Sequence, residues 1–195
     1  MLSMRALILT AAGVAAWLTL ASRLSAVDEL PQLLWPTVGG EINLDFGEEW
    51  VLNGCDRQPM KHAGIDIAVA SGTPVFATED GIVRHAEGAQ RVQGGQWIVI
   101  SHIHQGSEYT SSYWHVVPSV RPGQAVTRGQ QIATVDGVPD NEHFHFALRD
   151  ARYGPIAHNL ALPATRNCTP LLPKFPEHFL PPTLFVQPPN PRMLR

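Results

Sequence analysis

Four histidines and one aspartate occur in three short segments of this chain, and side chains of these types bind metal ions. The segments are HAGID with His62 and Asp66, YWH with His115, and HFH with His143 and His145. Within HAGID and HFH the two residues are an even number of positions apart, so on a β-strand both would point to the same face. Imidazole and carboxylate groups hold catalytic zinc, and three of them leave one coordination position free for water. Convergence of the segments therefore predicts a metal-dependent hydrolase.

Each segment alone also has a purely structural interpretation. His62 and Asp66 could form the exposed face of a turn. In HFH, Phe144 and Phe146 are expected to pack into the core while the two histidines face outward, an arrangement that favours a ligand without requiring one. The metal prediction depends on the conjunction of the segments. Ordinary surface or half-buried positions are expected for the isolated histidines His85, His104, His158 and His178.

Length and composition limit the chain to one ordinary domain. It has 195 residues, 44% of them hydrophobic, which is enough for one core but hardly for two. The formal net charge of -3 gives no electrostatic basis for binding nucleic acid. A helical bundle would not tolerate 17 prolines and 16 glycines, which indicate many turns and short strands.

Residues 1–26 are expected to lie outside the fold. Arg5 supplies a positive charge, residues 6–22 are uncharged, and small residues follow, with cleavage expected after Ala21 or Ala26. This order is typical of a signal peptide, and a retained N-terminal membrane anchor is the alternative. Either one would place the domain outside the cytoplasm, in the periplasm or as a secreted protein.

Export would make Cys55 and Cys168 a candidate disulfide. The two cysteines lie close to the ends of the expected domain, and an oxidising compartment permits them to pair. Closing a loop of that length would stabilise the fold by roughly 4–5 kcal/mol in the chain-entropy model. Neither has a second cysteine or a histidine at ligand spacing, so free thiols are the main alternative.

Short strands are predicted to position the histidines. Gly64 would let the backbone come close to a ligand, and the residues after it are rich in β-branched side chains. The pattern contains no helix of more than two turns before residue 150 and predicts an all-β domain. The expected strands are 42–46, 65–69, two joined by a hairpin at 79–81, 97–100, an alternating one from Tyr109 to His115, two within 120–135, and 143–150.

The C-terminal segment differs in composition from the rest. Eight prolines occur between Pro170 and Arg195, without a periodic pattern. Residues 169–195 are therefore expected to form an extended tail that is at most partly ordered. Composition does not decide whether this tail covers an edge of the barrel or contacts a partner.

Over residues 35–150 the order and spacing of the motifs resemble those of the lysostaphin-like peptidoglycan metallopeptidases. The matching motifs are HAGID, SGTPVFATEDGIV, WIVISH, YWH, VRPGQAVTRGQQIA and HFHF. The resemblance implies a compact, mostly antiparallel β-sandwich with a groove lined by the site. It implies a metallopeptidase domain at 27–168, followed by the Pro-rich tail.

The resemblance also implies a role for each residue of the site. His62, Asp66 and His145 would bind Zn²⁺. His143 would be the general base, and His115 would help to polarise the bound water or stabilise the oxyanion. The expected activity is zinc-dependent endopeptidase cleavage of peptide bonds in peptidoglycan cross-links or stem peptides.

The sequence departs from the family pattern beside HFH. Asn141-Glu142 precedes His143 where a small-residue approach is common, and Ala147 follows HFHF where an acidic residue is frequent. Neither change removes a ligand, but both are expected to reshape the groove and narrow the substrate preference.

Three other functions compete with the peptidase. A non-catalytic wall-binding or regulatory module could keep the fold and recruit a protein partner, activating another wall hydrolase. A non-peptidase zinc hydrolase on another fold is the second. A lipoyl- or biotin-type carrier is excluded, since the only lysines, Lys61 and Lys174, are not at the tip of the candidate hairpin.

Overall fold

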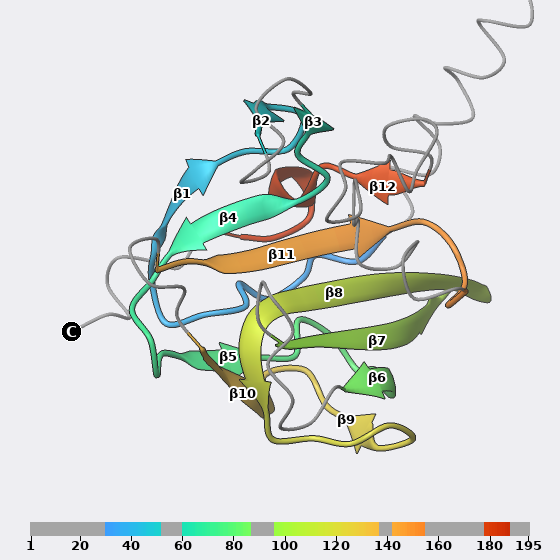
Figure 1. The fold of residues 1–195 in the computed structure, drawn as a ribbon. Coiled ribbons are helices and arrows are strands. Elements are labelled where there is room, and N and C mark those ends of the chain that lie inside the picture. Colours follow the sequence, from blue (N-terminus) through green and yellow to red (C-terminus); the bar gives the residue numbers. More distant parts are fainter. Residues whose placement is uncertain (1–29, 52–59, 87–95, 137–141, 155–177, 188–195) are drawn as a thin grey trace, which may run out of the picture. The chain divides into compact units, whose positions relative to one another are not determined.

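The computed structural model describes residues 30–51, 60–86, 96–136, 142–154 and 178–187 (Figure 1). All its strands belong to the compact unit Pro31–Arg195. Within the described ranges no helix is both long and apolar enough to span a membrane. The predicted signal peptide, both cysteines and His158 lie outside these ranges.

The described chain is almost entirely antiparallel β-structure, which confirms the predicted fold class. A two-stranded sheet consists of β2 (Glu49–Trp50) and β3 (Met60–Lys61). The strands of a ten-stranded sheet are β1 (Glu41–Leu44), β4 (Ile65–Ala68), β5 (Pro74–Phe76), β6 (Gly81–Ala86), β7 (Gln96–His104), β8 (Ser107–Pro118), β9 (Ala125–Val126), β10 (Gln131–Val135), β11 (Phe144–Arg149) and β12 (Phe179–Leu180). Their main order is β1-β4-β11-β8-β7-β6-β9, with β10 joining β5 to β8 and β12 extending the sheet beside β11.

Alternating side chains direct one face of this sheet into the core. Ile98 and Ile100 of β7, Tyr113 of β8, and Phe144 and Phe146 of β11 are completely buried. The rings of Tyr113 and Phe146 pack with their centroids 5.3 Å apart. Burying such a side chain stabilises a fold by roughly 1.5–3 kcal/mol. The opposite face of β11 is thereby left to His145, as the sequence predicts.

A bulge bends β8. Trp114 pairs with Trp97 of β7, whereas Val116 pairs with the preceding residue, Gln96, so that His115 is an extra residue in β8. His115 has a φ of 61°, in the left-handed region. Beyond this point β8 pairs with β10, and the ribbon turns out of the plane of β7 and β11 (Figure 1). Bulges of this kind bend a strand and re-aim a side chain.

The hairpin predicted at 79–81 is wrong, although both of its strands exist. β5 pairs with β10, and β6 pairs with β7 and β9, instead of with each other. The turn residue Asp80 accepts a 2.7 Å hydrogen bond from the backbone N–H of Arg128. The Arg128 side chain also forms a 2.7 Å ion pair with Glu79. The turn is therefore held against the segment between β9 and β10.

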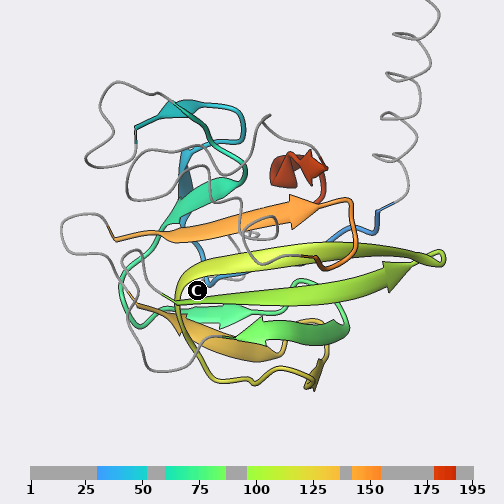
Figure 2. The same ribbon diagram turned by 45° about the vertical axis from the view of Figure 1, so that its right-hand side comes forward.

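Part of the predicted tail is an ordered element of the sheet. β12 pairs with the end of β11, and the 3₁₀ turn η1 (Pro182–Leu184) follows it (Figure 2, red). Phe179 is buried against Ala63 and Ala147. Leu33 donates a backbone hydrogen bond of 2.8 Å to Phe185. This segment lies against the sheet, which is one of the two roles left open by composition.

Candidate metal centre

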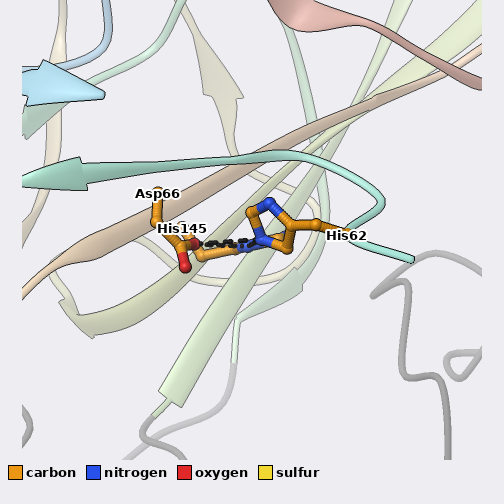
Figure 3. A group of neighbouring side chains, drawn as sticks. All are labelled: His62, Asp66 and His145. Atoms are coloured by element: carbon orange, nitrogen blue, oxygen red, sulfur yellow. Dashed lines mark hydrogen bonds and ion pairs between the residues drawn. The ribbon is translucent and has the colours of Figure 1, made fainter. Parts of the chain in front are cut away.

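Strand pairing brings two of the candidate ligands together. Asp66 of β4 lies directly opposite His145 of β11 in the antiparallel ladder. His62 precedes β4, where the chain turns out of β3, so the even spacing within HAGID does not act through a strand as predicted. The turn instead places the His62 ring beside the other two side chains, with its edge toward them (Figure 3).

Three ligand atoms converge in this group. His145 Nδ1 lies 2.9 Å from Asp66 Oδ1 and 2.9 Å from His62 Nε2. His62 Nε2 lies 3.2 Å from Asp66 Oδ1. Ligands about 2.05 Å from a tetrahedral zinc ion are separated by about 3.3 Å. The set of two nitrogens and one oxygen therefore fits a zinc ion, with a fourth position left for water.

The charge states of these groups also fit a metal ion. Burial raises the pKa of Asp66, but hydrogen bonds with His145 and His62 outweigh it and hold the pKa well below its usual range. Burial lowers the pKa of His145, against the opposing effect of Asp66. At neutral pH the group is thus a carboxylate and an uncharged imidazole, the forms in which these side chains bind metals.

The turn before β2 fixes the orientation of His62. The Nδ1–H of His62 donates to the carbonyl oxygen of Asp45 at 3.2 Å, which leaves Nε2 as the atom facing the site. The backbone of His62 donates to Glu48 and accepts from Gly47, both at 2.8 Å. Such outer contacts hold a metal-binding imidazole in one tautomer.

Gly64 permits the close packing of β4 on β11. A Cβ atom at this position would overlap the carbonyl oxygen of Phe146 and lie 2.9 Å from the Cε1 and Nε2 atoms of His145. Gly64 therefore lets the backbone come close to the His145 side chain, and its predicted role next to a bound ligand stays a prediction.

The other two predicted site residues lie beside this group. His143 Nε2 is 3.7 Å from Asp66 Oδ2. The His115 ring packs against the His143 ring with centroids 4.4 Å apart and planes at 69°. The structure therefore brings all five predicted residues together. His85, His104 and His178 are half-buried or exposed, as predicted.

The alternation predicted along β8 fails at His115. It holds through Tyr113, whose ring is in the core, and continued alternation would turn His115 toward that core as well. Because of the bulge, His115 instead shares a face with its neighbour Trp114, and the two rings stack with planes at 12°.

Sequence reasoning missed two supporting groups. The Trp114 ring meets the His145 ring edge-on, with centroids 6.0 Å apart. The sequence pattern that could have identified Trp114 is a large aromatic residue in the same alternating series as the polar residues Thr110 and Ser112. The partner of His62, Asp45, acts through its backbone carbonyl and therefore leaves no signal in residue type.

The chain is similar in sequence to known proteins. The profile described as Peptidase family M23 matches residues 60–157. Over 100 residues the chain is 34% identical to the peptidoglycan DD-endopeptidase ShyA of Vibrio cholerae, with 50% of this chain and 22% of ShyA covered. Over 117 residues it is 39% identical to the murein hydrolase activator NlpD of Escherichia coli, with 59% and 27% covered.

Among solved structures, a zinc-containing peptidase from Vibrio cholerae is 29% identical, with a TM-score of 0.49. The match covers 62% of this chain and 36% of that one. The chain thus spans well under two thirds of the length of each of these three proteins.

Proposed function

Because the chain belongs to peptidase family M23, which confirms its resemblance to the lysostaphin-like metallopeptidases, we propose that it is a zinc-dependent endopeptidase. Its substrate in this proposal is a peptide bond in a cross-link or stem peptide of peptidoglycan. The observation that carries the proposal is the cluster of His62 Nε2, Asp66 Oδ1 and His145 Nδ1, whose separations of 2.9–3.2 Å suit one zinc ion.

In this proposal the three clustered side chains hold the ion. Zinc, when bound, would polarise the scissile carbonyl and lower the pKa of its bound water to about 7. The low exposure of the side chains of His62, Asp66 and His145, at 4%, 13% and 9%, keeps bulk water away from the ligands.

His143 is the proposed general base. Its Nε2 lies beside the carboxylate of Asp66, so it borders the ligand cluster without belonging to it. A neutral imidazole there can accept a proton from the attacking water at Nε2 and deliver it to the leaving amine. Asp66 would stabilise the imidazolium formed between these two steps.

His115 is the proposed stabiliser of the oxyanion. Its ring packs against the ring of His143, and its backbone is fixed by the β8 bulge. An imidazole N–H aimed at the carbonyl oxygen stabilises the negative charge that develops there.

The cellular setting is part of the same proposal. The N-terminal segment would direct the protein to the periplasm or the exterior, where cross-linked peptidoglycan is found. ShyA carries the name of a DD-endopeptidase, which supports cleavage of a cross-link between peptides. We also propose a narrow substrate preference, because Glu142 and Ala147 depart from the family pattern beside the HFH motif. The structure buries Ala147 under Phe179, so the C-terminal segment occupies the space beside this position.

Digestion of cross-linked sacculi tests the activity. Purified protein with zinc should release monomeric muropeptides, identified by mass spectrometry, and a chelator should stop the release until zinc is restored. The His143→Ala variant, which retains the three ligands, is the matched control. Intact sacculi after incubation with zinc-loaded protein would contradict the proposal.

A regulatory module is the second candidate, and the identity to NlpD supports it. Such a module would bind sacculi without cutting them and would stimulate a separate wall hydrolase. The two candidates differ in one readout: a module should stimulate that hydrolase equally well after His143→Ala, whereas an endopeptidase should lose its own cleavage.

A further inference from the structure

Trp114 links two parts of the proposed catalytic site. Its ring stacks on His115 with centroids 5.3 Å apart and planes at 12°. It also meets the His145 ring at 87°, with centroids 6.0 Å apart. Neighbours on a regular strand point to opposite faces, so this stacking exists only because of the bulge at His115.

The backbone at His115 is strained by its position. A φ of 61° is uncommon for a residue with a Cβ atom, and the left-handed region costs such residues roughly 1–2 kcal/mol. The conformation is imposed from both sides, because Trp114 is paired with Trp97 and His145 while Val116 is paired with Gln96. Strain of this kind persists where the surroundings over-determine the backbone, and it is common at functional sites.

The indole of Trp114 is itself held in place. Trp97 meets it edge-on, with centroids 6.0 Å apart and planes at 79°. Trp97 is 9% exposed, clusters with Val99 and Tyr153, and stacks on the His85 ring with centroids 5.7 Å apart. A row of rings therefore crosses β6, β7, β8 and β11, from His85 to the proposed ligand His145. Trp114 cannot turn away from His115 without displacing this row.

We propose that Trp114 is a positioning residue for hydrolysis: its ring holds the His115 imidazole against His143. The inference rests on the proposed endopeptidase function and adds to it a residue that touches neither substrate nor metal. A group already held in its reactive orientation avoids the ordering cost that a free side chain would incur in the transition state. Loss of Trp114 should therefore remove part of what His115 contributes to kcat.

A double-mutant cycle tests whether Trp114 acts through His115. We expect Trp114→Leu to lower kcat by about 10-fold while KM changes by less than about 3-fold, and Trp114→Phe to restore most of kcat. In the His115→Ala background, Trp114→Leu should have almost no further effect. An equal fractional loss in both backgrounds would overturn the proposal. So would a loss of zinc in Trp114→Phe, because it would show that the ring acts on His145.

A spectroscopic measurement separates this inference from the proposed function. The indole ring current should shift the His115 ring protons in the NMR spectrum, and the shift should disappear in Trp114→Leu. Trp35→Phe is the matched control for Trp114→Phe, since Trp35 is buried elsewhere and donates to Gly39. If sacculi are not cut, the proposed function fails, while unchanged His115 shifts in both Trp114 variants would refute the positioning itself.

Discussion

β8 and β11 lie side by side and each carries one histidine of the site, but they present it differently. In β11 the alternation is regular: Phe144 and Phe146 are in the core and His145 is on the opposite face. In β8 the alternation holds through Tyr113 and then breaks at His115, which is an extra residue with a positive φ. One strand thus presents its histidine by register and the other by a bulge.

The difference follows from where each strand runs. β11 is paired along its length with β8, β4 and β12, and its two buried phenylalanines fix a register that cannot slip without exposing them. β8 must leave the plane of β7 and β11 to reach β10, and it turns at the bulge. A regular strand can present a side chain to the site without backbone strain. A bulge lets a strand present two successive side chains on the same face, here Trp114 and His115.

The largest expected effect concerns His143 and His115, the two site histidines that are not proposed as zinc ligands. His143→Ala and His115→Ala should each lower the rate of sacculus digestion by about 10²–10⁴-fold, because each removes a positioned acid–base or oxyanion group. Zinc content, measured on the same preparations, should stay near one ion per chain. Wild-type turnover in either variant would show that its histidine has no part in the chemistry, whether it is presented by register or by bulge.

The packing that supports the regular strand can be broken at Gly64. Gly64→Ala should destabilise the protein by about 1–3 kcal/mol and weaken zinc binding by about 10–100-fold, because the new Cβ displaces Phe146 and the His145 ring. Gly81→Ala is the control, since its Cβ would also overlap its surroundings, 2.6 Å from Ser101 O, but far from the ligands. Equal zinc affinity of the two variants in chelator competition would show that Gly64 has no specific role.

His102 of β7 is a buried histidine that lies outside the proposed site, on the face of the sheet that forms the core. The Nδ1–H of His102 donates to the Asp80 carbonyl at 2.8 Å, and its Nε2 lies 2.7 Å from the Ser111 hydroxyl. Burial lowers the pKa of His102, although Asp80 and Glu79 oppose this. The proton that would charge the His102 imidazole is therefore bound less tightly in the folded state than in the unfolded chain.

The contribution of His102 to the free energy of unfolding should therefore be fully present above about pH 6.5. It should fall as the pH drops below that value, by up to about 1.4 kcal/mol per pH unit. His102→Gln keeps an N–H donor for Asp80 but cannot take up a proton. Urea unfolding of zinc-loaded protein between pH 7 and 5 should show a shallower loss in the variant. The same slope in both proteins would mean that His102 does not contribute.

The smallest expected effect is the difference in stability between a glycine and an alanine variant. This difference should have opposite signs at the bulge in β8 and in the regular strand β11. At His115 the left-handed backbone favours glycine, so His115→Gly should be more stable than His115→Ala by about 1 kcal/mol. At His145, in a regular strand, glycine should be less stable than alanine by about 0.5–1 kcal/mol. Denaturant titration of the four metal-free variants measures both differences. The same sign at both positions would show that the two backbones do not differ in their preference for glycine.

The comparison also explains what the sequence could predict. The regular part of the site was predictable, because alternating apolar residues define the face of β11 and identify His143 and His145 together. His115 was identifiable by its motif but not by its geometry, since nothing in Tyr-Trp-His marks an inserted residue. The convergence of His62 was predicted for the wrong reason, because a turn held by backbone groups produces it instead of a strand.

Zinc stoichiometry, measured side by side in the wild-type protein and in His145→Ala, tests the proposed metal centre most directly. We expect about one tightly bound zinc ion in the wild type and none that survives dialysis in the variant, because His145 Nδ1 contacts both of the other proposed ligand atoms. His104→Ala, a change at a histidine remote from the site, should retain the ion. Full occupancy in His145→Ala, or a wild-type protein that binds no zinc, would contradict the assignment of this centre.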